Sequence, residues 1–470
     1  MKLIFFILLA FSLGSCSTHD TLNPVDMEDW AEVHRKAEDG DPYFQGALGG
    51  SIRRGELGRV DHAQALMLLQ KSAKQENPIG LYNLGLLYHQ GQGVTKNRVK
   101  AKELVKNALP GMQDLANQDD PRAQTNLGYM YEVGFAVHPS LRKAIEYYEA
   151  AAEQGFARAQ NNLGVLYQLG QGLTQDLVRA QEYYQESANQ GYARAQANLG
   201  RLYEQGLGVP QDLSEAAKWY LMAARHHNSL AQNRLGKMYE TGSGYRQDLE
   251  EALIWYQKAA EQQYPPAMIN LGWFYQSGKA VSLDERTAAQ WYLKAMRHGA
   301  GSSARKALQR LLKHLDRKKK SLDLTGENLS ELDLKSLNFR RVQLQGANLL
   351  RADLSWAELH EANLSYADLR QAKLYYTRFR KADLTGAKLD HANIREADFT
   401  GATLVQASFF KSTLNRVDFK NADCSKASFD QAQWTEPKLE GAKFHFTKFL
   451  PQNIKETLDK EGIWRAKNKH

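Results

Sequence analysis

Residues 157–192 read ARAQNNLGVLYQLGQGLTQDLVRAQEYYQESANQGY, and this segment is the clearest copy of the motif that determines the fold. Its Leu163-Gly164 dipeptide recurs at a fixed spacing of 36 residues, at Leu127-Gly128, Leu199-Gly200, Leu235-Gly236 and Leu271-Gly272. A constant period of this length is the signature of a repeat array. The fold is therefore best predicted one repeat at a time.

Within this copy the apolar residues have helical spacing. Leu163, Leu166 and Tyr167 share one face of a first helix, and Gly170 stands where that helix should end in a left-handed cap. A second helix is expected from about Leu177 until shortly before Gly191. Small and large residues hold fixed columns, which lets neighbouring hairpins interlock: Ala144, Ala180, Ala216, Ala252 and Ala288 beside Tyr148, Tyr184, Tyr220, Tyr256 and Tyr292.

One motif carries a family resemblance. Residues 193–206 read Ala-x-Ala-x-x-x-Leu-Gly-x-x-Tyr-x-x-Gly, and 216–224 read Ala-x-x-Trp-Tyr-x-x-Ala-Ala. This pattern resembles Sel1-like repeats, which are relatives of tetratricopeptide repeats. The resemblance implies an all-α superhelix of helical hairpins over residues 26–315, with about seven units and a capping helix at 30–37. One step lengthens to 43 residues, which predicts an insertion at 110–120.

A curved stack of hairpins presents a concave face lined by the first helices. Opposite the apolar stripe of the 157–192 copy lie Arg158 and Asn161. Equivalent positions form two columns, one of Arg122, Arg158 and Arg194 and another of Arg201, Lys237 and Trp273. An arginine ladder suits carboxylates or phosphates, which guanidinium groups bind in bidentate fashion. The alternative is a solvated face on which Glu132, Glu204 and Glu240 neutralise the cations.

From Leu324 the period changes to five. An apolar column holds Leu344, Leu349 and Leu354 and runs on to Phe449, with Ala347, Ala352 and Ala357 in a second column. Neither a helix nor a flat strand has this period, whereas a square coil with one five-residue unit per side does, if both columns point inward. The pattern Ala-Asp/Asn-Leu-x-x resembles the pentapeptide-repeat family. The resemblance implies a right-handed quadrilateral β-helix over residues 322–450, so the predicted fold class is two consecutive solenoids.

The ends of this second solenoid depart from its pattern. Large or charged residues replace the small column in the early units, namely Glu327, Leu332, Leu337 and Val342, which predicts a first coil docked on the helical array. Residues 451–470 are expected to cap the last coil through a short helix carrying Ile454, Leu458, Ile463 and Trp464, because open coil ends are exposed strand edges. The basic residues of 316–321 predict a solvated linker, with membrane headgroups or an acidic partner as the alternative.

The N-terminus has the features of an export signal. Lys2 precedes an apolar run over residues 3–13, which ends in Leu13-Gly14-Ser15-Cys16. This tetrapeptide resembles the lipobox of bacterial lipoproteins. The resemblance implies a signal peptide over 1–15, a lipidated Cys16, a tether over 16–25, and an outer-membrane location facing the periplasm, with an ordinary signal peptide as the alternative. Cys424 is the one other cysteine and lies in the inward column, so a buried, inert thiol and no internal disulfide are expected.

Composition excludes several functional classes. The net charge is +8 and the mean hydropathy is −0.58, and past residue 13 no run approaches the roughly 18 apolar residues of a membrane helix. No basic stripe with interleaved aromatic residues is present, so nucleic acid is not an expected partner. The sequences Ser303-Ala304-Arg305-Lys306 and Ser408-Phe409-Phe410-Lys411 lack the partner motifs of serine hydrolases. No catalytic, metal or cofactor site is predicted.

These features favour a lipid-anchored envelope scaffold. The helical groove would bind a protein or peptide of the cell envelope, and the β-helix would serve as a rigid spacer or second interaction surface. Contact with an acidic polysaccharide or with peptidoglycan is a further expectation. The alternative function is a hydrolase or binder that acts on peptidoglycan or a β-lactam-type ligand.

Overall fold

The computed structural model describes residues 30–58, 60–456, 458–459 and 462–464. The predicted signal peptide, Cys16 and the tether lie outside these residues. The chain forms two compact units, whose boundary falls between Ala195 and Gln196 with residues 55–60 assigned to the second unit. The boundary therefore lies inside the helical array and not at the change of period near residue 320.

The first unit is built from antiparallel helix pairs. Its helices are α1 (Trp30–Glu38), α2 (Pro42–Arg54), α3 (His62–Lys74), α4 (Pro78–Gln90), α5 (Arg98–Asn117), α6 (Pro121–Val133), α7 (Leu141–Glu153), α8 (Ala157–Leu169) and α9 (Leu177–Asn189). Helix α10 (Ala193–Gln205) spans the boundary. The expected capping helix is present as α1. The predicted insertion extends α5 to 20 residues, with the exposed Pro110 inside the helix.

The pair α8 and α9 shows how the repeat folds. Helix α8 ends at Gly170, whose φ of 65° is the left-handed cap that glycine adopts without strain. Helix α9 begins after Asp176, whose carboxylate accepts the amides of Val178 and Arg179. A Cβ on Gly164 would lie 2.7 Å from the ring of Tyr184, so the Leu-Gly dipeptide leaves the space into which this tyrosine packs.

Every buried tyrosine of this column also satisfies its hydroxyl inside the repeat. The acceptor lies 16 residues earlier on the first helix of the same hairpin. The pairs are Tyr148 with Glu132 (2.6 Å), Tyr184 with Gln168 (2.8 Å), Tyr220 with Glu204 (2.6 Å), Tyr256 with Glu240 (2.7 Å) and Tyr292 with Gln276 (2.8 Å). A buried phenol without a partner would be costly, so these acceptors are structural.

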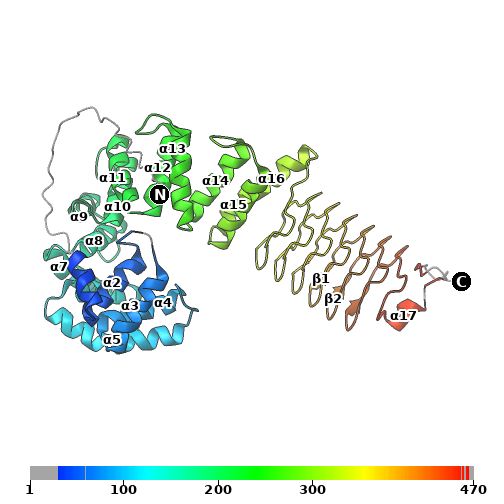
Figure 1. Cartoon of the computed structure of the whole chain (residues 1–470), viewed down its shortest axis with the longest axis horizontal. Helices are drawn as coiled ribbons and strands as arrows, with labels where there is room; N and C mark the ends of the chain where they lie inside the picture. Colours follow the sequence, from blue (N-terminus) through cyan, green and yellow to red (C-terminus); the bar gives the residue numbers. More distant parts are fainter. Residues whose placement is uncertain (1–29, 59, 457, 460–461, 465–470) are drawn as a thin grey trace, which may run out of the picture. The chain divides into compact units, whose positions relative to one another are not determined.

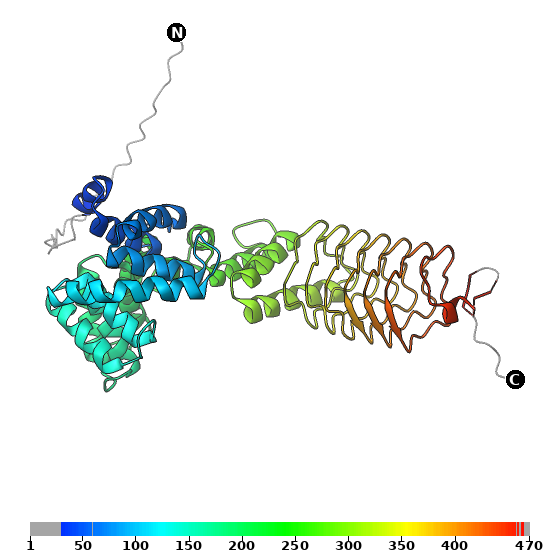
Figure 2. The ribbon, with the colours of Figure 1, turned by 90° about the horizontal axis from the view of Figure 1, so that it is seen from below.

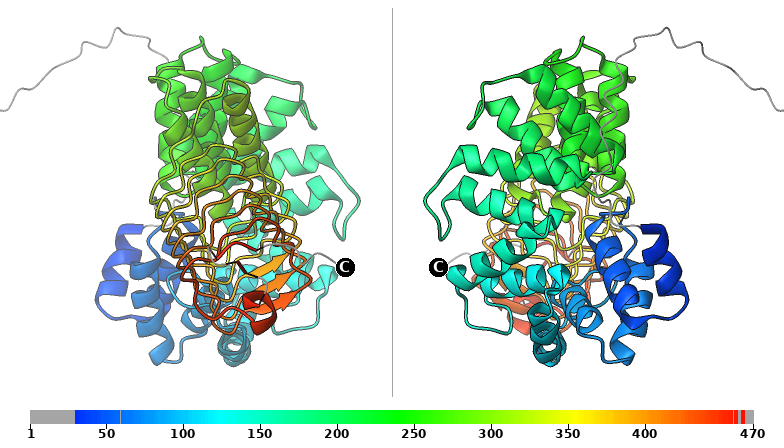
Figure 3. Two further views of the ribbon diagram at one scale, coloured as in Figure 1. Left: turned by 90° about the vertical axis from the view of Figure 1, so that its right-hand side faces the viewer. Right: turned by 90° about the vertical axis from the view of Figure 1, so that its left-hand side faces the viewer.

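The second unit continues the array and then changes architecture. Its helices are α11 (Leu213–Arg225), α12 (Ser229–Thr241), α13 (Leu249–Glu261), α14 (Pro265–Ser277), α15 (Glu285–Arg297) and α16 (Gly301–Arg317), followed by successive coils and a short helix, α17 (Gln452–Lys455). Figure 2 shows the coils side by side after α16. Three short strands, β1 (Asn393–Arg395), β2 (Thr413–Asn415) and β3 (Gln433–Thr435), pair in parallel on one side, and Figure 3 shows them in orange.

The coils have four sides of five residues each. Parallel bridges join residues 20 apart, such as Asp323 with Gln343 and Asn348 with Asp368. Both predicted columns point inward, and Leu354 and Ala357 have no exposed surface. Phenylalanines of successive coils stack, with 4.7 Å between the ring centroids of Phe379 and Phe399. The predicted fold class of two solenoids is confirmed.

The Asp or Asn of the repeat has a role that the period did not reveal. The carboxylate of Asp353 accepts the amide of Ser355 at 3.1 Å and so closes a local turn. The next residue, Trp356, has a φ of 64°, a conformation that costs a side-chain-bearing residue about 1–2 kcal/mol. Its amide donates to the Tyr375 carbonyl of the next coil at 2.8 Å, so stacking of the coils offsets this cost.

The last helices and the first coils share one hydrophobic core. Leu332 and Leu337, two of the large residues in the small-residue column, are buried in the same cluster as Leu308 and Leu312 of α16. Glu327, a third, accepts a hydrogen bond from Gln290 of α15 at 2.6 Å. The first coil is therefore docked on the helices, as expected.

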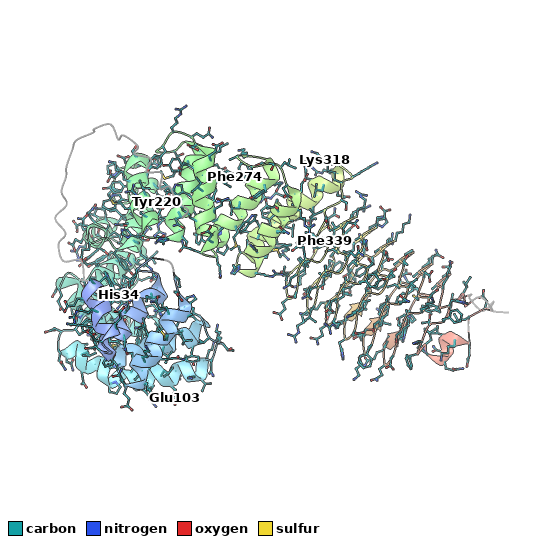
Figure 4. The ribbon with its side chains drawn as sticks, in the orientation of Figure 1. His34, Glu103, Tyr220, Phe274, Lys318 and Phe339 are labelled. Atoms are coloured by element: carbon teal, nitrogen blue, oxygen red, sulfur yellow. The ribbon has the colours of Figure 1, made fainter. Side chains whose placement is uncertain are left out.

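The residues expected to form a basic linker take part in this junction. Asp316 and Arg317 belong to α16. Asp316 accepts from Asn338 at 3.0 Å and pairs with Arg341 of the early coils. Figure 4 labels Lys318 just after α16 and Phe339 in the coils that follow. Asp316 therefore connects α16 to the early coils, while residues 317–321 are exposed.

The last coil is covered by the chain that follows it. Ile454 of α17 is buried, and the amide of Trp464 donates to the carbonyl of Ala442 at 3.0 Å. The prediction of one short helix carrying all four apolar residues was wrong: α17 holds only Ile454, while Leu458 bridges Trp464 and Ile463 bridges Lys443 in antiparallel pairs. These bridges occupy the strand edge of the last coil. Within the described residues no helix has the length and apolar character that a bilayer crossing requires.

Candidate protein-binding face

In the predicted arginine column of the first unit, Arg122 forms hydrogen bonds inside the helical array. Arg122 donates to the hydroxyl of Tyr43 at 2.9 Å, and Tyr43 donates to Asp120 at 2.5 Å. Burial, together with the nearby charge of Arg158, lowers the pKa of Arg122 to about 10. Arg122 is thus one member of an internal network that ties α2 to α6.

Arg158 and Arg194 are also engaged by the chain itself. Arg158 donates to the side chain of Asn126 at 2.8 Å, on the preceding first helix. Arg194 is exposed and donates to the carbonyl of Arg54 at 3.3 Å, across 140 residues of sequence. Asn161, predicted on the same face, is buried. In the first unit Arg122 and Arg158 are therefore held by internal hydrogen bonds, whereas Arg194 remains exposed.

The second predicted column lies at the surface of the second unit. Arg201 on α10 is half-buried, Lys237 on α12 is exposed, and Trp273 on α14 is half-buried. Lys237 forms an ion pair with Glu240 at 3.0 Å. The ammonium group of Lys279 lies 4.1 Å from the centroid of the Trp273 ring, a cation–π contact.

Three further side chains on these first helices belong to the same surface. Arg234 lies 3.7 Å from Glu204, and Asn270 donates to Asn233 at 2.9 Å. The sequence pattern did not single these residues out, although Arg234 and Asn270 recur at the same 36-residue step. We define the first-helix face by Arg201, Asn233, Arg234, Lys237, Asn270 and Trp273.

The glutamates expected to neutralise the cations have a second role. Glu132, Glu204 and Glu240 each accept the hydroxyl of a buried tyrosine. Glu240 also meets Lys237, and Glu204 approaches Arg234. Glu204 and Glu240 therefore each connect a buried tyrosine of their hairpin to a cation of the first-helix face.

The remaining candidates for chemistry are structural or exposed. Over the described part of the chain no group of three or more His, Cys, Asp or Glu residues could hold a metal. The hydroxyl of Ser408 donates to Asp390, and Ser303 is exposed at the start of α16. Burial raises the pKa of the Cys424 thiol well above its usual range, as expected for an inert cysteine.

Comparison with known families agrees with this architecture. The Sel1 repeat family matches seven segments, which together make up more than half of the chain: residues 43–77, 78–108, 121–156, 157–192, 193–228, 229–264 and 265–299. This chain is a Sel1-repeat protein. Eight copies of pentapeptide repeats match residues 338–375 and 377–416. The gap in the Sel1 matches between residues 108 and 121 coincides with the predicted insertion.

Several solved structures are similar to parts of this Sel1-repeat protein. A Sel1 repeat protein from Oxalobacter formigenes is 32% identical over 59% of this chain and 78% of its own, with a TM-score of 0.41. A protective antigen present in uropathogenic Escherichia coli strains, displaying an SLR fold, is 31% identical over 60% of this chain and 59% of its own, with a TM-score of 0.39. The match thus spans less than two thirds of that antigen.

The second solenoid has its own similar structure. HetL, a pentapeptide repeat protein involved in heterocyst differentiation regulation from the cyanobacterium Nostoc, is 26% identical over 31% of this chain and 75% of its own, with a TM-score of 0.21. No curated protein matches the chain. Sel1 repeats are protein-interaction scaffolds, so the family supports a binding protein and leaves its partner open.

Proposed function

We propose that this Sel1-repeat protein is a lipid-anchored scaffold of the bacterial envelope that binds a protein or peptide along the first-helix face. The β-helix acts as a rigid spacer or as a second interaction surface. The lipobox-like sequence that ends at Cys16 supports the anchor and the outer-membrane location. The position of the binding face is supported by the difference between the two predicted columns: Arg122 and Arg158 are used inside the first unit, whereas Arg201, Lys237 and Trp273 lie at the surface of the second.

The chemistry of the first-helix face suits a peptide chain. Side-chain amides such as that of Asn233 pair with backbone groups of an extended segment, and cations such as Lys237 pair with its carboxylates. Trp273 supplies an aromatic anchor of the kind that dominates binding energy at interfaces. The single observation that carries the proposal is that polar, cationic and aromatic groups recur along α10, α12 and α14, whereas Arg122 and Arg158, the cations predicted on the first helices of the first unit, are held by internal hydrogen bonds.

Site-specific crosslinking tests the position of the face. A photoreactive residue in place of Lys237 should form an adduct with an envelope protein in cells. Lys258 on α13 is the control, because it is also an exposed lysine but lies on the second helix of its hairpin, 4.1 Å from the centroid of the Trp255 ring. Equal adducts at both positions, or none at position 237, would contradict the proposal.

A paired substitution then tests the energetics with the crosslinked partner in purified form. Trp273→Ala should weaken its binding by about 10-fold or more, the loss of roughly 1.4 kcal/mol or more that an aromatic anchor contributes. Trp255→Ala removes the same side chain from a second helix and should leave the affinity unchanged. A loss of equal size for both variants would point to stability and not to a binding face.

The anchor is tested separately. Cys16→Ala should abolish the incorporation of labelled fatty acid and release the protein from the membrane fraction. Incorporation of label into the Cys16→Ala variant at the unsubstituted level would disprove lipidation at this residue, without affecting the proposed binding face.

A further inference from the structure

The junction between α16 and the first coils holds an open cleft outside the first-helix face. Its volume is about 500 Å³, and it lies in the second unit, beside the helix that closes the array. The residues that line it are Arg305, Lys306, Gln309, Arg310, Lys335, Ser336 and Leu337. Four of these seven side chains are cationic, so the cleft differs in character from the mixed surface around it.

The charges of the cleft are only partly balanced. Arg305 pairs with Asp333 at 3.0 Å, and Lys335 pairs with Asp353 at 3.3 Å. Lys306 and Arg310 are exposed and meet no carboxylate in the described part of the chain; Arg310 donates only to the backbone of α16. Two positive charges therefore remain for an anion that enters the cleft.

An aromatic platform adjoins this cleft. The amide of Ser336 donates to the carbonyl of Ser355 at 3.0 Å, which places Trp356 one coil away from Ser336 in the same column. One face of the Trp356 ring is covered by Tyr376, with 4.1 Å between centroids and 14° between planes. The coil on its other side carries only the small Ser336 at this position. The indole is 56% exposed and lies one coil beyond Ser336, which lines the cleft.

Several cations elsewhere on the β-helix are paired from coil to coil. The ion pairs include Arg351 with Glu331, Arg378 with Glu358, Arg416 with Glu436 and Lys420 with Glu440. A long polyanion such as nucleic acid would need a continuous basic track, which this pattern interrupts. Lys306 and Arg310 both line the cleft, so a ligand there needs few charges placed close to a flat apolar face.

We infer that this cleft and Trp356 together form a binding site for an acidic saccharide. The face of a sugar ring presents C–H groups of slight positive charge, which stack on the negative face of an aromatic ring. A carboxylate on the same sugar then reaches the cations, where Arg310 can bind it through two N–H groups. An acidic peptide or an anionic headgroup would use the cations but would have no reason to require the indole.

The test uses the full-length protein and isothermal titration with an oligomer of galacturonic acid. We expect binding of this probe and none of the uncharged galactose oligomer. Lys306→Ala with Arg310→Ala, and separately Trp356→Ala, should each lower the affinity by a factor of 10 or more. Arg416→Ala and Tyr366→Ala are matched controls: Arg416 is an exposed arginine and Tyr366 a 60% exposed ring on the same β-helix, and both variants should bind as the unsubstituted protein does.

Three results would overturn the inference. The first is no binding of the acidic oligomer, and the second is equal binding of the uncharged one. The third is binding of oligoglutamate or phosphatidylglycerol vesicles that Trp356→Ala leaves unchanged, which would assign the cleft to acidic peptides or to lipid. Trp356→Phe guards against a folding artefact, because it keeps an aromatic face and should retain most of the affinity; a loss equal to that of Trp356→Ala would also refute the role of stacking.

Discussion

Substitution of Gly236 tests the physical account of the repeat most directly. A Cβ at this position on α12 would lie 2.8 Å and 2.9 Å from two ring carbons of Tyr256 and 3.1 Å from the carbonyl of Ala252. The ring cannot retreat, because its hydroxyl is bonded to Glu240 and its edge packs against Phe274 at 5.5 Å between centroids. Gly236→Ala therefore forces two buried groups into overlap.

The magnitude follows from two opposing terms. Alanine in a helix interior gains about 1 kcal/mol over glycine from its higher helix propensity. Overpacking of a filled core costs typically 1–3 kcal/mol, and the constrained ring places this site at the upper end. The free energy of unfolding of the α12–α13 hairpin should fall by about 2 kcal/mol once the gain of about 1 kcal/mol is subtracted.

Hydrogen exchange followed by mass spectrometry is the suitable assay, because a repeat array can unfold in parts. Peptides from α12 and α13 should exchange faster in Gly236→Ala, and the denaturant midpoint of the helical signal at 222 nm should decrease. Gly301→Ala is the control, since a Cβ there meets nothing within 4 Å. Tyr256→Leu combined with Gly236→Ala should destabilise less than the sum of the two changes. Equal, unchanged stability of Gly236→Ala and Gly301→Ala would refute the reasoning.

Two further predictions address the alkaline limit and the second solenoid. Burial raises the pKa of Tyr148, Tyr220 and Tyr256, whereas tyrosines of the unfolded chain ionise near pH 10. This contribution to the free energy of unfolding is therefore complete below pH 10 and falls above it by about 1.4 kcal/mol per pH unit and tyrosine. Phenolate absorbance at 295 nm should rise together with loss of helical signal, and ionisation with intact helices would contradict this. Phe409→Ala should destabilise the β-helix by about 3–5 kcal/mol, because this ring is fully buried and stacked within it, whereas Phe446→Ala, at a 72% exposed ring, should change thermal unfolding by less than about 0.5 kcal/mol.

The two predicted columns show what the sequence could not reveal about the binding face, because Arg122 and Arg158 of the first column are used inside the first unit. The 36-residue step places both Arg158 and Lys237 on the first helices of their hairpins, at different positions of the repeat. It cannot show what lies opposite them, because this depends on how repeats that are distant in sequence approach one another. Arg194 reaches the backbone of Arg54 across 140 residues, and no local pattern encodes that distance.

The sequence by itself determined the fold class, the helix ends and the inward columns. A residue such as Gly164 or Leu354 recurs because it has the same neighbours in every unit, so the repeat period alone predicts its surroundings. Tertiary structure alone decided that Arg122 and Arg158 serve an internal network, that α16 and the first coils share a core, and that a basic cleft forms where they meet. These features arise where the repetition ends or where separate repeats meet, and contacts of that kind leave no periodic trace in the chain.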